Sequence, residues 1–348
     1  MRLLFIKPKH IGDSLILTPT LVAARQAYPD AEIWVMVRRG CEGILAGCPE
    51  IDRILLLAAV DKASRTRGDF WRELGIALQM PRVKFDYVFE LGDGHRARLF
   101  AMLARTRRRY SVRPSSPLQP FERWRFSAVS DLDWNGVHRV EKDYRAVAEF
   151  LPLPEEIPPL RFARERTKPW PPADGLSGFA VVQIGTRQGR NRWARERWLE
   201  VVRHLLERCG HVVLTCGADP AEVAEADSIQ AELGPRALCT RGEAGWAQIA
   251  DLFYRASICV TPMTAAMHLA AACACPIVAV CGPVMELHWR PWRAPHRIVS
   301  SDDCAGVTDP SELVRRVYAR TMDAVPASAV IRACDELLAS ELKPSFRS

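Results

Sequence analysis

The segment RLLFIKPKHIGDSLILTP, residues 2–19, joins an apolar run to a helix-like run through a short turn that contains Gly12 and Asp13. The apolar run predicts a buried strand, and the glycine–aspartate pair predicts the turn into a helix. In α/β proteins a turn of this kind commonly binds phosphate, but here it carries a carboxylate. The residues alone leave two interpretations of Asp13 open: it caps the helix, or it has a chemical role.

The same alternation of strand and helix continues along the chain. Further apolar runs that predict strands lie at residues 32–37, 53–57, 85–91, 108–112, 178–184, 211–217, 257–262 and 276–282. Most of them are separated by helix-length amphipathic segments, and this βαβ rhythm predicts mostly parallel sheets. The expected fold class is therefore α/β, with two Rossmann-like, doubly wound domains.

A proline-rich stretch interrupts the rhythm and marks the domain boundary. Seven prolines fall between residues 152 and 172, where they disfavour both helix and central strand. We predict an N-terminal domain at 1–155, a linker at 156–178 and a C-terminal domain at 179–322. Residues 323–348 are expected to form a terminal helix and tail that could pack back on the N-terminal domain.

The composition is that of an ordinary globular protein, with 48% hydrophobic and 26% charged residues. No apolar run approaches the roughly 20 residues of a spanning helix, and Lys7 and Lys9 interrupt any signal-peptide core. A cytoplasmic location is therefore expected. The eleven cysteines and eight histidines form no metal-binding spacing, so no metal site is expected.

The net charge of +7 is concentrated in the first third of the chain. One interpretation is a solvated basic surface, and the other is a face that meets an anionic partner: nucleic acid, a phospholipid surface or a phosphorylated substrate. Nucleic acid is disfavoured because aromatic residues do not alternate with these arginines and no known module is present.

Two loops after predicted strands of the second half suit an anionic ligand. The loop GTRQGRNRW, residues 185–193, combines backbone donors, a hydroxyl and guanidinium groups, which suits a diphosphate, although it could also be an exposed basic loop. In TPMTAAMHLAAA, residues 261–272, Thr264 holds a cap position and His268 follows one turn later. A buried histidine of the core is the alternative for His268. Neither G-x-G-x-x-G nor a P-loop motif is present.

Together these segments resemble glycosyltransferase family 9, the heptosyltransferases of lipopolysaccharide core assembly. The similar segments are LLFIKPKHIGDSLILTPTLVAARQAYPDA, FDYVFELGDGHRARLFAMLAR, GTRQGRNRWARERWLEVV and HLAAACACPIVAVCGPVMELHWRPW. The resemblance implies a GT-B fold with two facing domains, the second holding a nucleotide-sugar, expected to be ADP-linked, and the first holding the acceptor. It also implies inverting transfer without a metal ion or other cofactor.

The resemblance also assigns roles to residues. It makes Asp13 the general base, which agrees with the need of an inverting transfer for a base on the acceptor side. The expected donor-binding residues are Thr186, Arg187, Arg192, Glu222, Thr264, His268 and Gly282, with Arg192 where the family usually has lysine. The expected acceptor-binding residues are Lys7, Lys9, His10, Lys62, Arg65, Arg67 and Arg96.

The chain departs from the family in one donor loop. Where the family has D-[ST]-G-P-M-H, this sequence has Met263, Thr264, Ala265, Ala266, Met267 and His268, so a carboxylate and a glycine are absent. The main expectation is transfer of heptose to a lipopolysaccharide core or related glycan, by a protein in peripheral contact with the anionic inner membrane. A different donor, a different acceptor, or a GT-B pseudoenzyme that binds without transfer are the alternatives.

Overall fold

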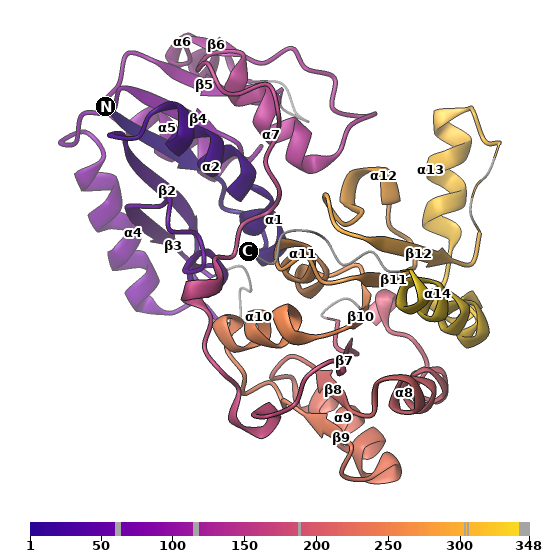
Figure 1. The fold of residues 1–348 in the computed structure, drawn as a ribbon. Helices are drawn as coiled ribbons and strands as arrows, with labels where there is room; N and C mark the ends of the chain where they lie inside the picture. Colours follow the sequence, from indigo (N-terminus) through magenta and orange to yellow (C-terminus); the bar gives the residue numbers. More distant parts are fainter. Residues whose placement is uncertain (60–63, 114–117, 187–188, 303, 305, 341–348) are drawn as a thin grey trace. The chain divides into compact units, whose positions relative to one another are not determined.

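The computed structural model describes residues 1–59, 64–113, 118–186, 189–302, 304 and 306–340. The chain divides into two compact units, Met1–Arg161 and Phe162–Ser348, each drawn in Figure 1. The division falls inside the stretch predicted as a linker. The second half of that stretch belongs to the second unit, because Lys168 N–H donates to the Ala247 carbonyl at 3.1 Å and the Tyr254 hydroxyl donates to the Phe162 carbonyl at 2.6 Å.

The first unit contains a parallel six-stranded sheet in the order β3-β2-β1-β4-β5-β6. Its strands are β1 (Arg2–Ile6), β2 (Glu32–Arg38), β3 (Arg53–Leu57), β4 (Tyr87–Glu90), β5 (Arg109–Ser111) and β6 (Ala128–Val129). The central strand β1 is buried on both faces, as its unbroken apolar run predicts.

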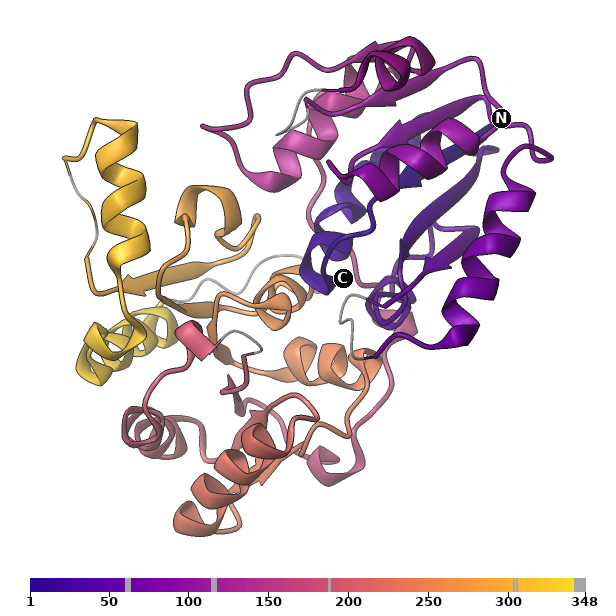
Figure 2. The same ribbon diagram turned by 180° about the vertical axis from the view of Figure 1, so that it is seen from behind.

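Helices cover both faces of this sheet. They are α1 (Ile11–Ile16), α2 (Thr18–Ala27), α3 (Glu42–Leu45), α4 (Arg67–Gln79), α5 (His95–Leu103), α6 (Pro120–Arg125) and α7 (Arg139–Ala148). Buried residues of α4 and α5 share one core with Leu4 and Ile6 of β1, whereas α2 packs against α7. α2 lies over the sheet in Figure 1 and α5 lies over it in the view from behind in Figure 2, so these helices cover opposite faces.

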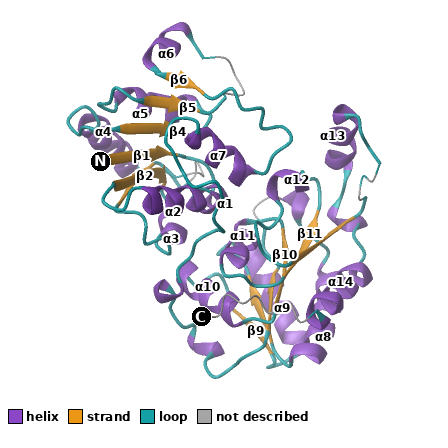
Figure 3. Ribbon diagram, turned by 45° about the horizontal axis from the view of Figure 1, so that its top comes forward, coloured by secondary structure: helices purple, strands orange, loops and turns teal. Residues whose placement is uncertain are grey.

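The second unit has the same topology. Its parallel sheet runs β12-β11-β10-β7-β8-β9, so its first and fourth strands are again neighbours at the centre. Figure 3 shows the two sheets as separate groups of strands. The strands are β7 (Ala180–Gln183), β8 (Val212–Thr215), β9 (Ala237–Cys239), β10 (Ile258–Pro262), β11 (Ile277–Cys281) and β12 (His296–Ser300).

The helices of the second unit lie between its strands and after the last of them. They are α8 (Arg195–Cys209), α9 (Pro220–Leu233), α10 (Trp246–Arg255), α11 (Ala265–Ala272), α12 (Glu286–Trp289), α13 (Pro310–Ala319) and α14 (Ala327–Ala339). Four short 3-10 helices lie at Arg164–Arg166, Pro171–Ala173, Gly189–Asn191 and Met322–Ala324. None of the helices in the described ranges is both long and apolar enough to span a bilayer.

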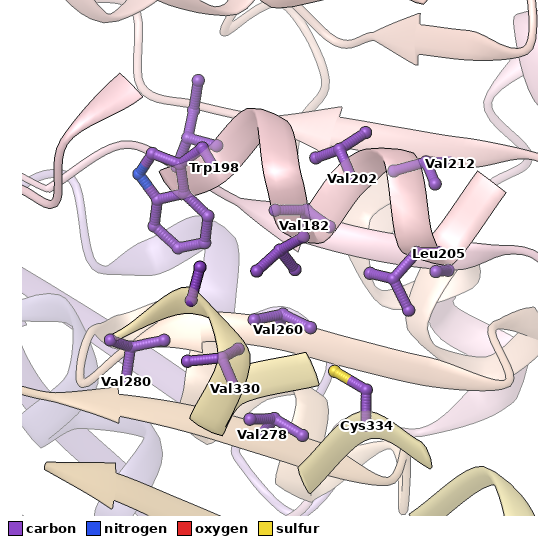
Figure 4. Packing of buried hydrophobic residues seen from close by; sticks show 14 of the residues in the cluster. Val182, Trp198, Val202, Leu205, Val212, Val260, Val278, Val280, Val330 and Cys334 are labelled. Atoms are coloured by element: carbon purple, nitrogen blue, oxygen red, sulfur yellow. The ribbon is translucent and has the colours of Figure 1, made fainter. Parts of the chain in front are cut away.

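The helices α8 and α14 cover one face of the second sheet. Trp198 and Leu205 of α8, together with Val330 and Cys334 of α14, pack on Val182, Val260 and Val278 of the central strands, as Figure 4 shows. The terminal helix, for which packing on the N-terminal domain was considered, is thus accounted for by the core of the second unit. Its amphipathic sequence needed an apolar surface, and the adjacent sheet supplies one. Residues 341–348 lie outside the described part of the chain.

This core yields a stability prediction. Trp198 is fully buried and packs edge-to-face on Trp193, with ring centroids 4.7 Å apart. Trp198→Ala should lower the free energy of unfolding by about 3–5 kcal/mol. Trp198→Phe should cost less, roughly 1.5 kcal/mol or below, because the lost indole N–H has no hydrogen-bond partner in the described residues. The measurement is urea denaturation monitored through hydrogen exchange of the amides in β7 and β10, which reports on unfolding of the second unit.

The matched control is Trp71→Ala in α4, because Trp71 is largely exposed. Its effect should stay within about 0.5 kcal/mol. Equal losses for the two alanine variants would contradict the assignment of Trp198 to the core.

Candidate functional site

Both sheets reverse their strand order between the first and the fourth strand. In the first unit β1 pairs with β2 on one side and with β4 on the other, and in the second unit β7 pairs with β8 and β10 in the same way. The loops that leave such a pair diverge, which opens a crevice at the carboxyl ends of the strands. The candidate residues Asp13, Thr186 and Thr264 all follow one of these four strands.

Asp13 is the third residue of α1, and its side chain is half-buried. One carboxylate oxygen, Oδ2, accepts a hydrogen bond from the backbone N–H of His10, which is the N-cap residue. Asp13 therefore contributes to capping from the third helical position and is not the N-cap itself. Its second oxygen makes no hydrogen bond to other described residues, so capping leaves one oxygen available for chemistry.

Lys7, one of the expected acceptor-binding residues, is buried. Its ammonium forms a buried ion pair with Asp143 of α7. Two opposite charges buried together stabilise one another, and removing either leaves an uncompensated buried charge. This pairing directs the charge of Lys7 toward Asp143 and ties α7 to the loop between β1 and α1, and the predicted contact of Lys7 with an anionic acceptor stays a prediction.

Sequence analysis missed a buried carboxylate at the end of β4. Glu90 accepts hydrogen bonds from the backbone N–H groups of Gly92 and Asp93, each at 2.8 Å, and from the Ser111 hydroxyl at 2.6 Å. Burial raises the pKa of Glu90. A Cβ atom at Gly92 would lie 2.9 Å from Pro8, so the loop after β4 packs directly on the loop after β1. Glu90 therefore fixes the second wall of the crevice.

Lys142 is a second residue that the sequence gave no reason to select. It is buried beside Asp143, and its ammonium lies 4.2 Å from the centre of the Trp134 ring. The pKa of Lys142 is lowered to about 8, mainly by burial and in part by the positive charges of Arg139 and Lys9, whereas the charge of Asp143 opposes this change. The ammonium thus belongs to a positively charged cluster near the β1 and β4 loops.

The other basic residues expected to bind an acceptor occupy the same edge of the first sheet. Lys9 is half-buried, and His10 and Arg67 are exposed. Lys62 lies outside the described residues, so its predicted role stays a prediction.

Arg65, Arg96 and Arg38 form a further cluster of positive charge. Burial lowers the pKa of Arg38, and the nearby charges of Arg65 and Arg96 lower it further. Arg96 also pairs with Glu73 at 3.1 Å. Arg38 ends β2 and donates to the carbonyl of Pro8 at 2.7 Å, which links the cluster to the loop after β1. Sequence analysis did not single out Arg38, because its place at this edge depends on the pairing of β2 with β1.

In the second unit, a side-chain relay orients the turn after β7. The Thr215 hydroxyl donates to Gln183 Oε1 at 2.8 Å, and Gln183 Nε2 donates to the carbonyl of Gly185 at 2.8 Å. The next residue, Thr186, is buried. Gln183 and Thr215 end neighbouring strands, so strand pairing sets the orientation of the Gly185–Thr186 peptide.

Glu222 lies between the loops after β7 and β8. Its Oε2 accepts the Gly217 N–H at 2.8 Å, and a Cβ atom at Gly185 would lie only 2.0 Å from that oxygen. The predicted contact of Glu222 with a nucleotide ribose stays a prediction. The structure shows in addition that this carboxylate holds the two loops together, which requires glycine at position 185.

Thr264 and His268 flank the loop after β10. Thr264 is the N-cap residue of α11, and its hydroxyl oxygen is buried with no hydrogen-bond partner among the described residues. Such an orphaned hydroxyl at a helix N-terminus is suited to an anionic ligand. His268 is buried in the first turns of α11, 6.2 Å from the Trp289 ring.

The remaining residues predicted to bind the donor are Arg192, Arg187 and Gly282. Arg192 is exposed, and its positive charge opposes the rise that burial causes in the pKa of Glu225, so the guanidinium lies near α9. Arg187 lies outside the described residues. A Cβ atom at Gly282 would meet Met322 Sδ at 2.8 Å, so internal packing favours glycine there, and its predicted role in donor binding stays a prediction.

In the described ranges, no group of three or more His, Cys, Asp or Glu side chains is placed to hold a metal ion. All eleven cysteines are free thiols. The prediction that the chemistry needs no metal stays a prediction.

Comparison with known proteins identifies similar chains. The model of glycosyltransferase family 9 (heptosyltransferase) matches residues 72–309. Lipopolysaccharide heptosyltransferase 3 of Escherichia coli is 25% identical over 343 residues, which cover 94% of this chain and 97% of that protein.

Solved structures show the same fold. A family 9 glycosyl transferase from Veillonella parvula has a TM-score of 0.80 at 18% identity, covering 97% of each chain. Escherichia coli heptosyltransferase WaaC with ADP has a TM-score of 0.77 at 18% identity, covering 97% of this chain and 100% of that one. These likenesses confirm the predicted GT-B fold with two Rossmann-like domains.

The packing of Gly185 against Glu222 can be tested directly. Gly185→Ala should push the Glu222 carboxylate away from the Gly217 N–H and distort the turn at Thr186. A disrupted charge-assisted hydrogen bond costs about 1–3 kcal/mol, so affinity for ADP, measured by calorimetry, should fall roughly ten- to a hundredfold.

Gly189→Ala is the matched control in the same loop, because a Cβ atom there meets nothing within 4 Å. Its affinity for ADP should equal that of the parent. Adding Glu222→Ala to Gly185→Ala should relieve the clash, so the two changes should be non-additive. Wild-type affinity in the Gly185→Ala variant would remove this turn from the binding site.

Proposed function

Because the chain belongs to glycosyltransferase family 9, we propose that this enzyme transfers heptose from an ADP-linked donor to a lipopolysaccharide core or a related glycan. Three observations support the proposal. The relative of similar length is a lipopolysaccharide heptosyltransferase. The structural neighbour WaaC was solved with ADP. The second unit combines an oriented glycine turn and an orphaned hydroxyl at the crevice of its sheet. That last combination carries the proposal.

The donor diphosphate is assigned to the loops after β7 and β10. The peptide at Gly185 and the hydroxyls of Thr186 and Thr264 provide neutral donors, and Arg192 provides an exposed positive charge a few residues further along the chain. Hydrogen bonds and a guanidinium aimed at the phosphates stabilise the charge that develops on the leaving diphosphate. Such donors can replace a metal ion in this role, which supports the proposed metal independence.

The general base is assigned to Asp13. Direct displacement with inversion needs the acceptor hydroxyl to lose its proton while it attacks the anomeric carbon. One oxygen of Asp13 is fixed by the His10 N–H, and the other is available to accept that proton. The hydrogen bond from the His10 N–H to Oδ2 fixes the conformation of the Asp13 side chain, and this orients the second oxygen. Asp13 takes the proton of the acceptor hydroxyl while the acceptor oxygen bonds to the anomeric carbon. At the same time the bond from that carbon to the diphosphate breaks, and the nucleoside diphosphate leaves.

The acceptor is proposed to be a phosphorylated glycolipid or glycan. The supporting feature is the basic edge of the first sheet, where Lys9, Lys142, Arg65 and Arg96 lie. These charges suit phosphate groups on the acceptor. An acceptor anchored in the inner membrane would require the enzyme to work at the cytoplasmic membrane surface, in peripheral contact with it.

One specific observation favours a second candidate, a family member with another donor sugar. Met263 and Ala265 stand where the family has a carboxylate and a glycine, and both are half-buried beside Thr264. Methionine accepts hydrogen bonds from sugar hydroxyls poorly, and the alanine methyl group fills space beside the backbone.

Asp13→Asn tests the base. Asparagine can still accept the His10 N–H, so the cap should survive while the basic group is lost. We expect kcat to fall by about 10²–10⁴, with donor affinity by calorimetry nearly unchanged.

The control is Asp309→Asn. Asp309 caps α13 by accepting the backbone N–H groups of Ser311 and Glu312, so this variant alters a capping carboxylate away from the proposed chemistry. It should transfer at the parental rate. Turnover near the parental value in Asp13→Asn would restrict Asp13 to capping.

Met263→Asp combined with Ala265→Gly tests the donor loop. If the altered loop weakens contact with the sugar, the double change should recover about 1–3 kcal/mol, one to two decades in kcat/KM with ADP-heptose. The control Met263→Leu adds no hydrogen-bond acceptor and should not raise kcat/KM. Tight, selective use of ADP-heptose by the unaltered enzyme would show that the departure is neutral.

A further inference from the structure

The first unit exposes an unusual number of large apolar side chains on three successive helices. Among the described residues, seven of the eleven exposed large apolar side chains belong to α4, α5 and α6. They are Phe70 (63% exposed), Trp71 (67%), Leu74, Leu78, Leu99, Phe121 (63%) and Trp124 (83%). Scattered exposed apolar residues are normal, but four aromatic rings on neighbouring helices are not. We call this surface the α4–α6 face.

The three helices are held together as one surface. Buried residues of α4 and α5 share the same core beneath them. Glu73 of α4 pairs with Arg96 of α5 at 3.1 Å, and Arg98 of α5 pairs with Glu122 of α6 at 3.1 Å. The exposed aromatic residues are therefore carried by a connected scaffold.

The surroundings of these aromatic residues are strongly basic. Between residues 65 and 125 the sequence has 14 Lys and Arg against six Asp and Glu, an excess of eight, which is more than the +7 of the whole chain. Three of the six acidic residues, Asp69, Glu90 and Glu122, are buried. The accessible charge of this segment is accordingly still more positive than the sequence count.

Two of the aromatic residues, Phe70 and Trp71, lie near the edge of the sheet that carries Asp13. Helices α4 and α5 begin where the chain leaves β3 and β4, at the carboxyl ends of parallel strands. Asp69 in the first turn of α4 pairs with Arg39, which directly follows β2, at 2.8 Å. Phe70 and Trp71 adjoin this ion pair in sequence, and their rings contact each other edge-to-face.

We propose that the α4–α6 face docks on an anionic phospholipid bilayer, with Phe70, Trp71, Phe121 and Trp124 entering the headgroup region. Tryptophan and phenylalanine are favoured at this depth, and basic residues around them are attracted by anionic headgroups. A second copy of the chain fits less well, because a symmetric dimer would bring two like-charged surfaces together. This inference rests on the proposed membrane-linked acceptor but names the surface that makes the contact.

The test is binding of the full chain to vesicles. Flotation should show binding to vesicles of phosphatidylglycerol and phosphatidylethanolamine, weakening with added salt and weak with phosphatidylcholine alone. Replacing Phe70, Trp71, Phe121 and Trp124 by serine should reduce this binding by about tenfold or more. Because these side chains are exposed, the variant should keep its circular dichroism spectrum.

The matched control is Val314→Ser with Tyr318→Ser, which alters exposed apolar residues of α13 in the second unit. It should bind vesicles like the parent. Parental vesicle binding by the four-serine variant, or equal loss in the control, would overturn the proposal. The proposal would also be overturned if the parent did not bind vesicles. It would likewise be overturned if sedimentation showed that the parent is a dimer and the four-serine variant a monomer.

A second measurement separates this inference from the proposed function. Transfer to a water-soluble, delipidated core acceptor should be the same in the parent and the four-serine variant, because none of the four residues belongs to the proposed catalytic site. A parent that binds vesicles but transfers no sugar would refute the proposed function and leave the docking surface standing. A parent that transfers sugar but does not bind vesicles would refute the docking surface and leave the proposed function standing.

Discussion

The reversal of strand order at the centre of each sheet is the constraint on which the candidate site depends. β1 and β7 are hydrogen-bonded on both sides, so neither has a free edge, and the crossovers on their two sides run in opposite directions. Loops can diverge only at that point, and ligands of α/β sheets bind there for this reason. Strand pairing places Asp13 in the first unit, and Thr186 and Thr264 in the second, just beyond the carboxyl ends of these central strands.

Carboxylates bound to backbone N–H groups then make these crevices rigid. Glu90 fixes the loop after β4, and Glu222 fixes the loop after β8 against Gly185. In both places a glycine permits a contact that a Cβ atom would prevent. Loops held in this way would need less reorganisation when a ligand binds or when charge develops.

The local sequence was sufficient to predict most strands, but it could not predict which distant residues each side chain contacts. All nine predicted strands are present because continuous apolar runs have few alternative structures, whereas β6, β9 and β12 were missed as short or partly polar strands away from the centre of their sheets. The contacts of Lys7 and Gly282 could not be predicted for a different reason. Asp143 is 136 positions from Lys7 and Met322 is 40 positions from Gly282, so nothing near either residue in the sequence indicates its contact, and their predicted binding roles stay predictions.

The burial of Lys142 couples the stability of the first unit to pH. Its pKa of about 8 in the fold is below the ordinary value of 10.5. Between these two pH values the unfolded chain holds a proton that the folded chain has released, so stability rises with pH across that window. At neutral pH the folded state instead keeps an ammonium in a poorly solvated place. Asp143 stands beside this ammonium and raises its pKa, and a further anion bound there would act in the same direction and offset part of the cost of burial.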